Sequence, residues 1–198
     1  MSDTEELAAL LDARRKPNAD HALMDAQIFS RFGQTKSVMF TDLVGFSRRV
    51  EEFGILHFLQ LIHESESLFL PLIARHQGVC LKREGDSLMV LFDQATDALD
   101  AACALVQATH SVNLGRSGAD RIEVCIGLGH GELLLIDGKE VWGAEVNAAS
   151  KLGEEVAQGG DVLATESFRL ALPDAPFAEY GVLFGTRPAF RWTGGTLA

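Results

Sequence analysis

The order of apolar segments between residues 37 and 164 constrains the fold of this 198-residue chain most strongly. Short apolar runs typical of β-strands alternate with longer stretches of helical periodicity. Their order is strand, helix, strand, strand, helix, strand, which predicts an α+β sandwich with helices on one face of a sheet. The predicted strands are residues 37–41, 79–82, 87–92, 121–129 and 161–164, with short strands between 177 and 192, and the predicted helices are 47–76, 93–113 and 145–155.

Three local features refine this prediction. Residues 132–136 are expected to be the hairpin partner of the strand at 121–129, and residues 137–139 to form a turn. Pro71 lies inside the first long helical pattern, where it should kink or interrupt the helix.

Residues 1–33 are predicted to form a helical extension that precedes a main domain at 34–198. Ser2 and Glu5 have the spacing of a capping box, which predicts a first helix that ends before Pro17. A second helix should begin near Asp20 and stop at Gly33. We expect this extension to pack on the main domain or on a partner.

Composition excludes several classes of partner. Lys and Arg total 17 against 28 Asp and Glu, a formal net charge of −11. A chain this acidic is unsuited to sequence-independent nucleic-acid binding or to a polybasic membrane contact. The N-terminus resembles no signal peptide, and no apolar run approaches the ~20 residues of a membrane helix. Three cysteines in apolar contexts predict buried thiols, so we expect a soluble, cytoplasmic protein.

Two aspartates are placed to meet at one edge of the predicted sheet. Asp42 ends the first strand, and Asp86 precedes the third. In a right-handed strand–helix–strand unit the first two strands run parallel, with room for the third between them. Two facing carboxylates repel each other unless a cation lies between them, and Mg²⁺ or Mn²⁺ prefers such oxygen ligands. The pair therefore predicts metal-assisted phosphoryl or nucleotidyl transfer.

The segment after Asp42 suits a phosphate. Gly45 allows the backbone to approach a ligand closely, and the amides of Phe46 and Ser47 open a helix whose N-terminus favours phosphate. The alternative is structural, because an aspartate that ends a strand near a glycine is often only part of a turn or a helix cap.

Four segments together resemble the class III nucleotidyl cyclases, the adenylate and guanylate cyclase catalytic domains. The resemblance covers about residues 36 to 170 in order and at compatible spacing, and it implies a ferredoxin-like βαββαβ sandwich. One such motif would be weak, whereas four in register are specific. The segments are FTDLVGFS at 40–47, KREGDSLMVLF at 82–92, IGLGHGEL at 126–133 and WGAEVNAASK at 142–151.

The resemblance implies a reaction and an assembly. Asp42 and Asp86 would hold two Mg²⁺ or Mn²⁺ ions per site, with the Leu43 carbonyl as a further ligand. The ribose 3′-hydroxyl of a nucleoside triphosphate would attack its own α-phosphate, giving a 3′,5′-cyclic nucleotide and pyrophosphate. Family members pair head to tail, so the resemblance implies a homodimer in which one protomer supplies the metals and the other recognises the base.

Two residues match the base-reading positions of adenylyl members. The Lys82 ammonium would donate to adenine N1, and Glu140, where such members more often have aspartate, would accept from the N6 amine. The same pair could donate to guanine O6 and accept from N1–H, so ATP is favoured and GTP is the alternative. Without the surrounding motifs, Lys82 would be interpreted as a solvated strand lysine and Glu140 as a turn carboxylate.

Three further residues match positions that act on ribose and phosphate. Asn147 matches the ribose-orienting asparagine, and Lys151 stands where the family has a catalytic arginine. An ammonium cannot reproduce the forked contact of a guanidinium, which predicts a slow enzyme. Arg187 lies near a triphosphate-binding lysine of the family, although it could be a surface turn residue. These departures support a second hypothesis, a cyclase-like module that binds nucleotide with little turnover and acts as a sensor or partner subunit.

Overall fold

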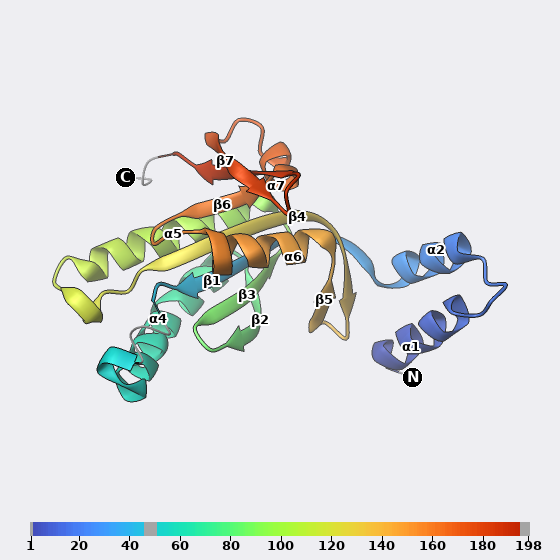
Figure 1. Ribbon diagram of the computed structural model, residues 1–198, viewed down its shortest axis with the longest axis horizontal. Helices are drawn as coiled ribbons and strands as arrows, with labels where there is room; N and C mark the ends of the chain where they lie inside the picture. The colour runs from blue at the N-terminus through green and yellow to red at the C-terminus, as the bar shows by residue number, and fades with distance from the viewer. Residues whose placement is uncertain (1, 46–50, 195–198) are drawn as a thin grey trace.

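The computed structural model describes residues 2–45 and 51–194, and it contains one open eight-stranded sheet (Figure 1). Its strand order is β2-β3-β1-β4-β6-β8-β7, with β5 paired to β4 outside this path. The predicted α+β architecture is therefore confirmed. The strands are β1 (Gly33–Leu43), β2 (Val79–Glu84), β3 (Ser87–Phe92), β4 (Val124–Ile136), β5 (Glu140–Trp142), β6 (Val162–Thr165), β7 (Phe177–Leu183) and β8 (Arg187–Trp192).

The helices frame this sheet and extend beyond it. Two of them precede β1, and the others come after it in the chain. They are α1 (Asp3–Arg14), α2 (His21–Phe32), α4 (Ile55–Arg75), α5 (Ala95–Asn113), a short 3-10 turn η1 (Gly118–Asp120), α6 (Ala144–Lys151), a π-helical turn η2 (Leu152–Val156) and α7 (Glu166–Ala171).

Strand β1 lies at the centre of the sheet. It pairs antiparallel with β3 on one side and with β4 on the other, and β3 in turn pairs antiparallel with β2. Strands β1 and β2 therefore run parallel with β3 between them, as the strand–helix–strand order predicts. The end of β1 and the β2–β3 turn meet at one edge of the sheet.

The two faces of the sheet are covered differently. Helices α4 and α5 pack on one face, where the largest apolar cluster includes Phe69, Phe92 and Leu105, all at most 2% exposed (Figure 1). Helix α6 packs on the opposite face against Val38 and Leu133. A sheet with apolar side chains on both faces must be covered on both, so helices lie on two faces and not on one as predicted.

Strand β4 corrects one sequence prediction. The expected hairpin between residues 121–129 and 132–136 is wrong, because β4 runs unbroken from Val124 to Ile136 beside the whole of β1. The chain reverses only after β4, where Asp137 and Gly138 adopt φ values of 50° and 66°. Positive φ at both central residues suits a tight hairpin turn, and β5 is the returning strand.

Other boundaries differ by a few residues. Helix α4 begins at Ile55 after Gly54, whose φ is 86°, and Pro71 lies within it without interrupting it. Strand β1 begins at Gly33, so the helical extension joins the sheet without a linker. The predicted short strands near the C-terminus are β7 and β8, whereas α7 was not predicted.

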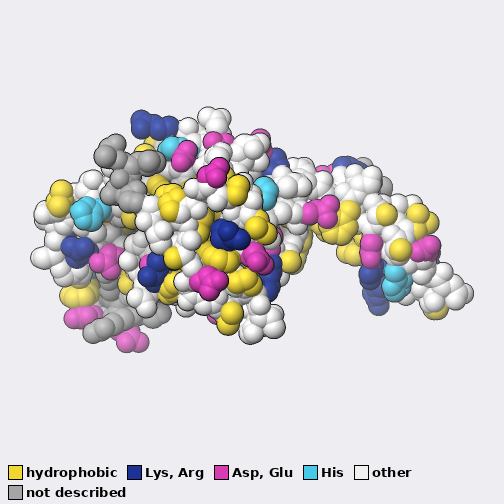
Figure 2. All heavy atoms as spheres, turned by 90° about the horizontal axis from the view of Figure 1, so that it is seen from above, with side chains coloured by type: hydrophobic (Ala, Val, Ile, Leu, Met, Phe, Trp, Pro, Cys, Tyr) yellow, Lys and Arg dark blue, Asp and Glu magenta, His cyan; other side chains and the backbone are white. Residues whose placement is uncertain are grey.

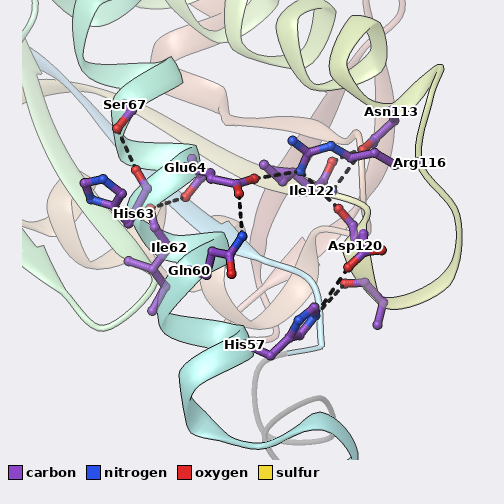
Figure 3. A network of polar contacts seen from close by, with 12 residues as sticks. His57, Gln60, Ile62, His63, Glu64, Ser67, Asn113, Arg116, Asp120 and Ile122 are labelled. Carbon is purple, nitrogen blue, oxygen red and sulfur yellow. Dashed lines mark hydrogen bonds and ion pairs between the residues drawn. The ribbon is translucent and has the colours of Figure 1, made fainter.

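Side-chain contacts tie α4 to the turn that follows α5 (Figure 3). Arg116 Nη1 lies 2.9 Å from Glu64 Oε2 and 3.2 Å from the Asp120 carbonyl oxygen. The Asn113 side chain exchanges two hydrogen bonds with the Ile122 backbone, at 2.7 and 2.9 Å. These contacts fix the covering helices behind the sheet and the entry to β4.

The predicted N-terminal helices form an arm that projects from the main body (Figures 1 and 2). The predicted capping box at Ser2 and Glu5 is present. At its base, α2 buries Ile28 and Phe32 against Ile136 at the end of β4. Among the residues that the structure describes, no helix is long and apolar enough to cross a membrane.

Candidate active site

The pairing of β1 with β3 brings two acidic residues together. The register sets Thr41 opposite Leu88, which places Asp42 beside Ser87 and next to Asp86 in the turn. The Ser87 hydroxyl donates to Asp42 Oδ1 at 3.0 Å, and the Leu88 amide donates to the Thr41 hydroxyl at 3.3 Å. The predicted meeting of the first and third strands at these carboxylates is therefore present.

Both carboxylates lie where a negative charge is disfavoured. Burial, followed by the charge of Asp86, raises the pKa of Asp42 to about 6. Burial also raises the pKa of Asp86, and the nearby Glu154 carboxylate adds to the increase for both groups. Asp86 Oδ2 is buried and has no hydrogen-bond partner in the described part of the chain. The pair thus carries more negative charge than its surroundings compensate.

These properties fit a divalent cation. A hard cation would satisfy the unpartnered oxygen and neutralise the two charges. Across residues 2–45 and 51–194, no cluster of three or more His, Cys, Asp or Glu side chains is arranged to hold an ion. The two aspartates would therefore share a metal with backbone, water or substrate oxygens, and the Leu43 carbonyl stays a predicted ligand.

The predicted phosphate segment lies partly outside the described residues. Gly45 has a φ of 84°, a conformation that favours glycine, and it turns the chain immediately after β1. Phe46 and Ser47 lie outside the described residues, so their predicted phosphate contacts stay predictions.

A second group of predicted residues lines a cavity of about 220 Å³ on the face covered by α6. Lys82 of β2, Glu140 of β5 and Asn147 of α6 all contribute to its wall. Lys82 Nζ lies 3.3 Å from Glu140 Oε2, with side chains 35% and 50% exposed. Strands far apart in the sheet thus bring a donor and an acceptor into one polar pocket that remains open to solvent.

A β-bulge directs Lys82 into this cavity. Cys80 pairs with Val90, but Lys82 pairs with Met89, so Leu81 is the extra residue. Met89 belongs to the apolar cluster under α6, whereas Val90 belongs to the cluster under α4 and α5. Because successive strand residues face opposite sides, the bulge moves Lys82 to the α6 side.

Two glycines of β4 let α6 lie directly on the sheet. A Cβ atom on Gly127 would be 2.1 Å from the Ala149 carbonyl oxygen, and one on Gly129 would be 2.6 Å from that of Glu145. Such distances are too short for any side chain. This close approach sets the height of α6 above the sheet and therefore the position of Asn147 at the cavity.

Lys151 is turned away from the cavity. Its ammonium lies 2.5 Å from Glu155 Oε2, one helical turn along, and 5.5 Å from the centre of the Phe184 ring. Asn147 and Lys151 therefore share α6, but the structure brings only Asn147 to the cavity wall.

Arg187 contacts the start of α6. Its guanidinium forms an ion pair with Glu145, which is 8% exposed, and it donates to the Ala144 carbonyl oxygen at 3.4 Å. The Thr165 hydroxyl donates to the same carboxylate at 2.5 Å. The contact of Arg187 with a triphosphate stays a prediction, and the contacts present anchor α6 to β6 and β8.

Sequence reasoning missed three residues of this region. Ser87 follows Asp86 directly, and its contact with Asp42 follows once the strand register is known. Glu145 lies in the first turn of a helix, where acidic residues are common, so its sequence position does not distinguish it from an ordinary helix-start residue. Glu154 lies in the π-helical turn η2. A prediction that assumes a regular α-helix there gives its side chain the wrong direction, and no sequence signal marks it as a neighbour of the aspartates.

Comparison with known proteins defines the class of this domain. The family model described as "Adenylate and Guanylate cyclase catalytic domain" matches residues 30–182. The chain therefore belongs to this family, and the resemblance of its four motifs is confirmed.

Individual relatives agree with this assignment. "Putative adenylate cyclase 3" of Rhizobium meliloti is 28% identical over 163 residues, and the serine/threonine-protein kinase pkn2 of Myxococcus xanthus is 28% identical over 138 residues. These alignments cover 79% and 70% of the chain but only 27% and 16% of the two relatives.

Solved structures share the fold. The adenylate/guanylate cyclase/hydrolase of Silicibacter pomeroyi has a TM-score of 0.68 at 26% identity, over 82% of this chain and 98% of that one. The adenylyl cyclase CyaB of P. aeruginosa has a TM-score of 0.68 at 20% identity, over 84% and 99%.

The raised pKa of Asp42 predicts a pH-dependent stability. A free aspartate titrates near pH ~4, whereas Asp42 in the fold has a pKa of about 6. The folded chain therefore binds more protons in this window, and the free energy of unfolding falls as the pH rises through it. Asp42→Asn keeps an acceptor for Ser87 and removes the charge, so its melting temperature should exceed that of the wild type above pH ~6.

The difference between variant and wild type should shrink toward pH ~4, where both states of the wild type become protonated. Added Mn²⁺ at pH 7.5 should raise the melting temperature of the wild type and leave Asp42→Asn nearly unchanged. A variant that is less stable than the wild type by the same amount at both pH values would contradict the electrostatic account.

Proposed function

We propose that this chain is a nucleotidyl cyclase that converts a nucleoside triphosphate, with ATP favoured, to the 3′,5′-cyclic nucleotide and pyrophosphate. The observation that carries the proposal is the Asp42–Asp86 pair, whose buried, unpartnered oxygen and raised pKa values suit two divalent cations. Two uncompensated carboxylates at one sheet edge destabilise the fold, so a purely structural role does not explain them. Membership of the cyclase family supports the same reaction class.

The acidic pair would hold Mg²⁺ or Mn²⁺. Bound there, such ions supply positive charge that favours the attacking 3′-oxygen and the leaving pyrophosphate. Asp42 and Asp86 orient the ions, and Asn147 orients the ribose so that its hydroxyl faces the α-phosphate. Lys151 would place its charge near the transferring phosphate after leaving Glu155.

The base would bind between Lys82 and Glu140. These side chains contact each other through one ion pair, and both are partly exposed, so a base can replace that contact with two hydrogen bonds. Adenine offers an acceptor at N1 and a donor at N6, which matches an ammonium and a carboxylate. Guanine offers an acceptor at O6 and a donor at N1–H. The acceptor and the donor thus exchange ring positions relative to adenine, so guanine matches the same two groups less closely.

A head-to-tail homodimer would complete each site. The cavity beside Lys82 measures about 220 Å³, and sites for drug-sized ligands are usually ~300–1,000 Å³. One protomer therefore encloses too little space for a nucleoside triphosphate. Exposed apolar side chains just before and at the start of α4, namely Phe53, Ile55 and Leu56, offer a surface that a second protomer can cover.

An activity assay with Asp86→Asn tests the reaction. Purified protein with Mn²⁺ should form a cyclic product from ATP, and more slowly from GTP. Asp86→Asn should reduce the rate to background, because the amide cannot replace a charged metal ligand, and it should fold normally because repulsion with Asp42 is relieved. Asp12→Asn, at an exposed position of α1, is the matched control and should retain full activity. If wild type and Asp86→Asn form equal amounts of product, the cyclase proposal is wrong.

Mixed dimers test whether two chains share each site. Asp42→Ala and Lys82→Ala should each be inactive alone, because one lacks the metal ligand and the other lacks the base donor. Mixing them at equal concentration should restore ~25% of wild-type activity, since half of the dimers are mixed and each mixed dimer has one complete site of two. The absence of rescue, with dimers confirmed by sedimentation, would refute a site built across two chains.

A second function is favoured by the position of Lys151. Its ammonium is held by Glu155 and Phe184, which would leave the transition state without the cation that the family places there. In that case the domain would bind nucleotide with little turnover and act as a sensor or as a subunit of another cyclase.

Lys151→Arg distinguishes the two functions. A guanidinium is longer and forks, so it can reach both the phosphate and Glu155, and the cyclase proposal predicts a severalfold increase in kcat with little change in KM. Glu155→Gln should raise kcat in the same direction by releasing the lysine. Nucleotide binding without product in the wild type and in both variants would favour the sensor function.

A further inference from the structure

The N-terminal arm contacts the turn end of the hairpin formed by β4 and β5 in two ways. Ile28 and Phe32 of α2 pack against Ile136, the last residue of β4. Asp137, the next residue, contacts the first turn of α1. Both helices of the arm therefore meet the hairpin at its turn, three residues before Glu140.

The contacts at the tip are reciprocal. Asp137 Oδ1 accepts from the Asp3 amide at 3.1 Å, and Asp137 Oδ2 accepts from the Thr4 hydroxyl at 2.6 Å. The Asp137 amide donates to Asp3 Oδ2 at 3.2 Å. The Thr4 hydroxyl, followed by backbone donors of α1, lowers the pKa of Asp137, so the carboxylate stays ionised at neutral pH. Residues more than 130 positions apart thus join a helix N-terminus to a hairpin turn, where a negative charge is favourable.

The arm itself is internally fixed. Arg31 of α2 lies 2.5 Å from Asp3 and 3.1 Å from Glu6 of α1, and Arg14 lies 2.5 Å from Asp25. These ion pairs hold the two helices together near both ends of α1. The arm can therefore transmit the position of α2, which leads directly into β1, to the tip of the hairpin.

Beside these contacts the arm and the hairpin leave a groove of about 580 Å³, lined mainly by apolar side chains together with Glu140 and Trp142. These two residues of β5 therefore border open space on the side of the arm. The arm supports β5 through the turn, by the apolar contact at Ile136 and the hydrogen bonds at Asp137. A short strand such as β5, with three residues and one neighbour, depends on such support.

We propose that Asp137 is a positioning residue that holds Glu140 at the distance from Lys82 that the nucleotide base requires. This inference rests on the proposed function, because it assumes that Glu140 faces the base. The Glu140 side chain is half exposed, and it contacts Lys82 at 3.3 Å, so burial does not fix it. Its position follows that of the hairpin, and the hairpin follows α1.

Asp137→Gly tests this role without straining the turn. The φ of 50° at Asp137 suits glycine and asparagine, whereas alanine would be strained there. Asp137→Gly removes the two contacts of the carboxylate and retains the backbone amide, and KM for ATP should rise about fivefold, with kcat changed by less than about twofold. Asp137→Asn keeps one acceptor and should lie between wild type and Asp137→Gly.

Thr4→Val tests the same contact from the other side. It removes the hydroxyl donor and leaves the hairpin sequence intact, so KM should rise in the same direction by a smaller factor. Asp12→Ala removes one negative charge from an exposed position of α1 and should leave KM and kcat unchanged. An equal change in Asp12→Ala would show that net charge, not the contact, causes the effect.

A binding measurement separates this inference from the proposed function. In a Trp192→Phe background, Trp142 is the single tryptophan, and it lies two residues after Glu140. Titration of its emission with a non-hydrolysable ATP analogue and Mn²⁺ should give an affinity about fivefold weaker for Asp137→Gly. Equal affinities and equal KM values would overturn the positioning role even if the wild type makes cyclic product. Weaker binding by Asp137→Gly in a protein without turnover would uphold the role and refute the cyclase proposal alone.

Discussion

The antiparallel pairing of β1 with β3 is the contact on which the candidate site depends. Its register places Asp42 beside Ser87 and Asp86, residues that the sequence separates by a long helix and a strand. A shift of one residue would turn one carboxylate to the opposite face of the sheet. Buried apolar side chains on both faces of β3, including Leu88 and Met89, oppose such a shift, so the core fixes the spacing of the two charges.

The sequence predicted the parts of the fold that local pattern determines. The order of elements, the parallel course of the first two strands with the third between them and the meeting of Asp42 with Asp86 follow from periodicity and from the handedness of crossovers. The unbroken β4 was missed because its glycines, Gly129 and Gly131, read as turn signals. They serve instead as close contacts under Glu145 of α6, a tertiary cause that no local pattern carries.

The candidate site was likewise predicted only in part from the sequence. Lys82, Glu140 and Asn147 were placed by the family resemblance, and they do line one cavity. Lys151 and Arg187 came from the same resemblance, yet their charges meet Glu155 and Glu145, partners that only the folded chain reveals. A motif specifies which residue types are present, whereas the orientation of a long charged side chain depends on which opposite charge the fold brings near it.

The β-bulge at Leu81 lets two consecutive side chains of β2 lie on the same face of the sheet. Because of it, Lys82 faces the cavity beside α6, whereas regular pairing of the same chain would set Lys82 opposite Leu88 and toward the helices behind the sheet. Loss of Leu81 would restore regular pairing with Lys82 still opposite Met89, so what the extra residue adds is an apolar contact under α6. Neighbouring positions of one strand thus supply a core contact and a cavity side chain on the same face, which the strict alternation of a regular strand does not allow.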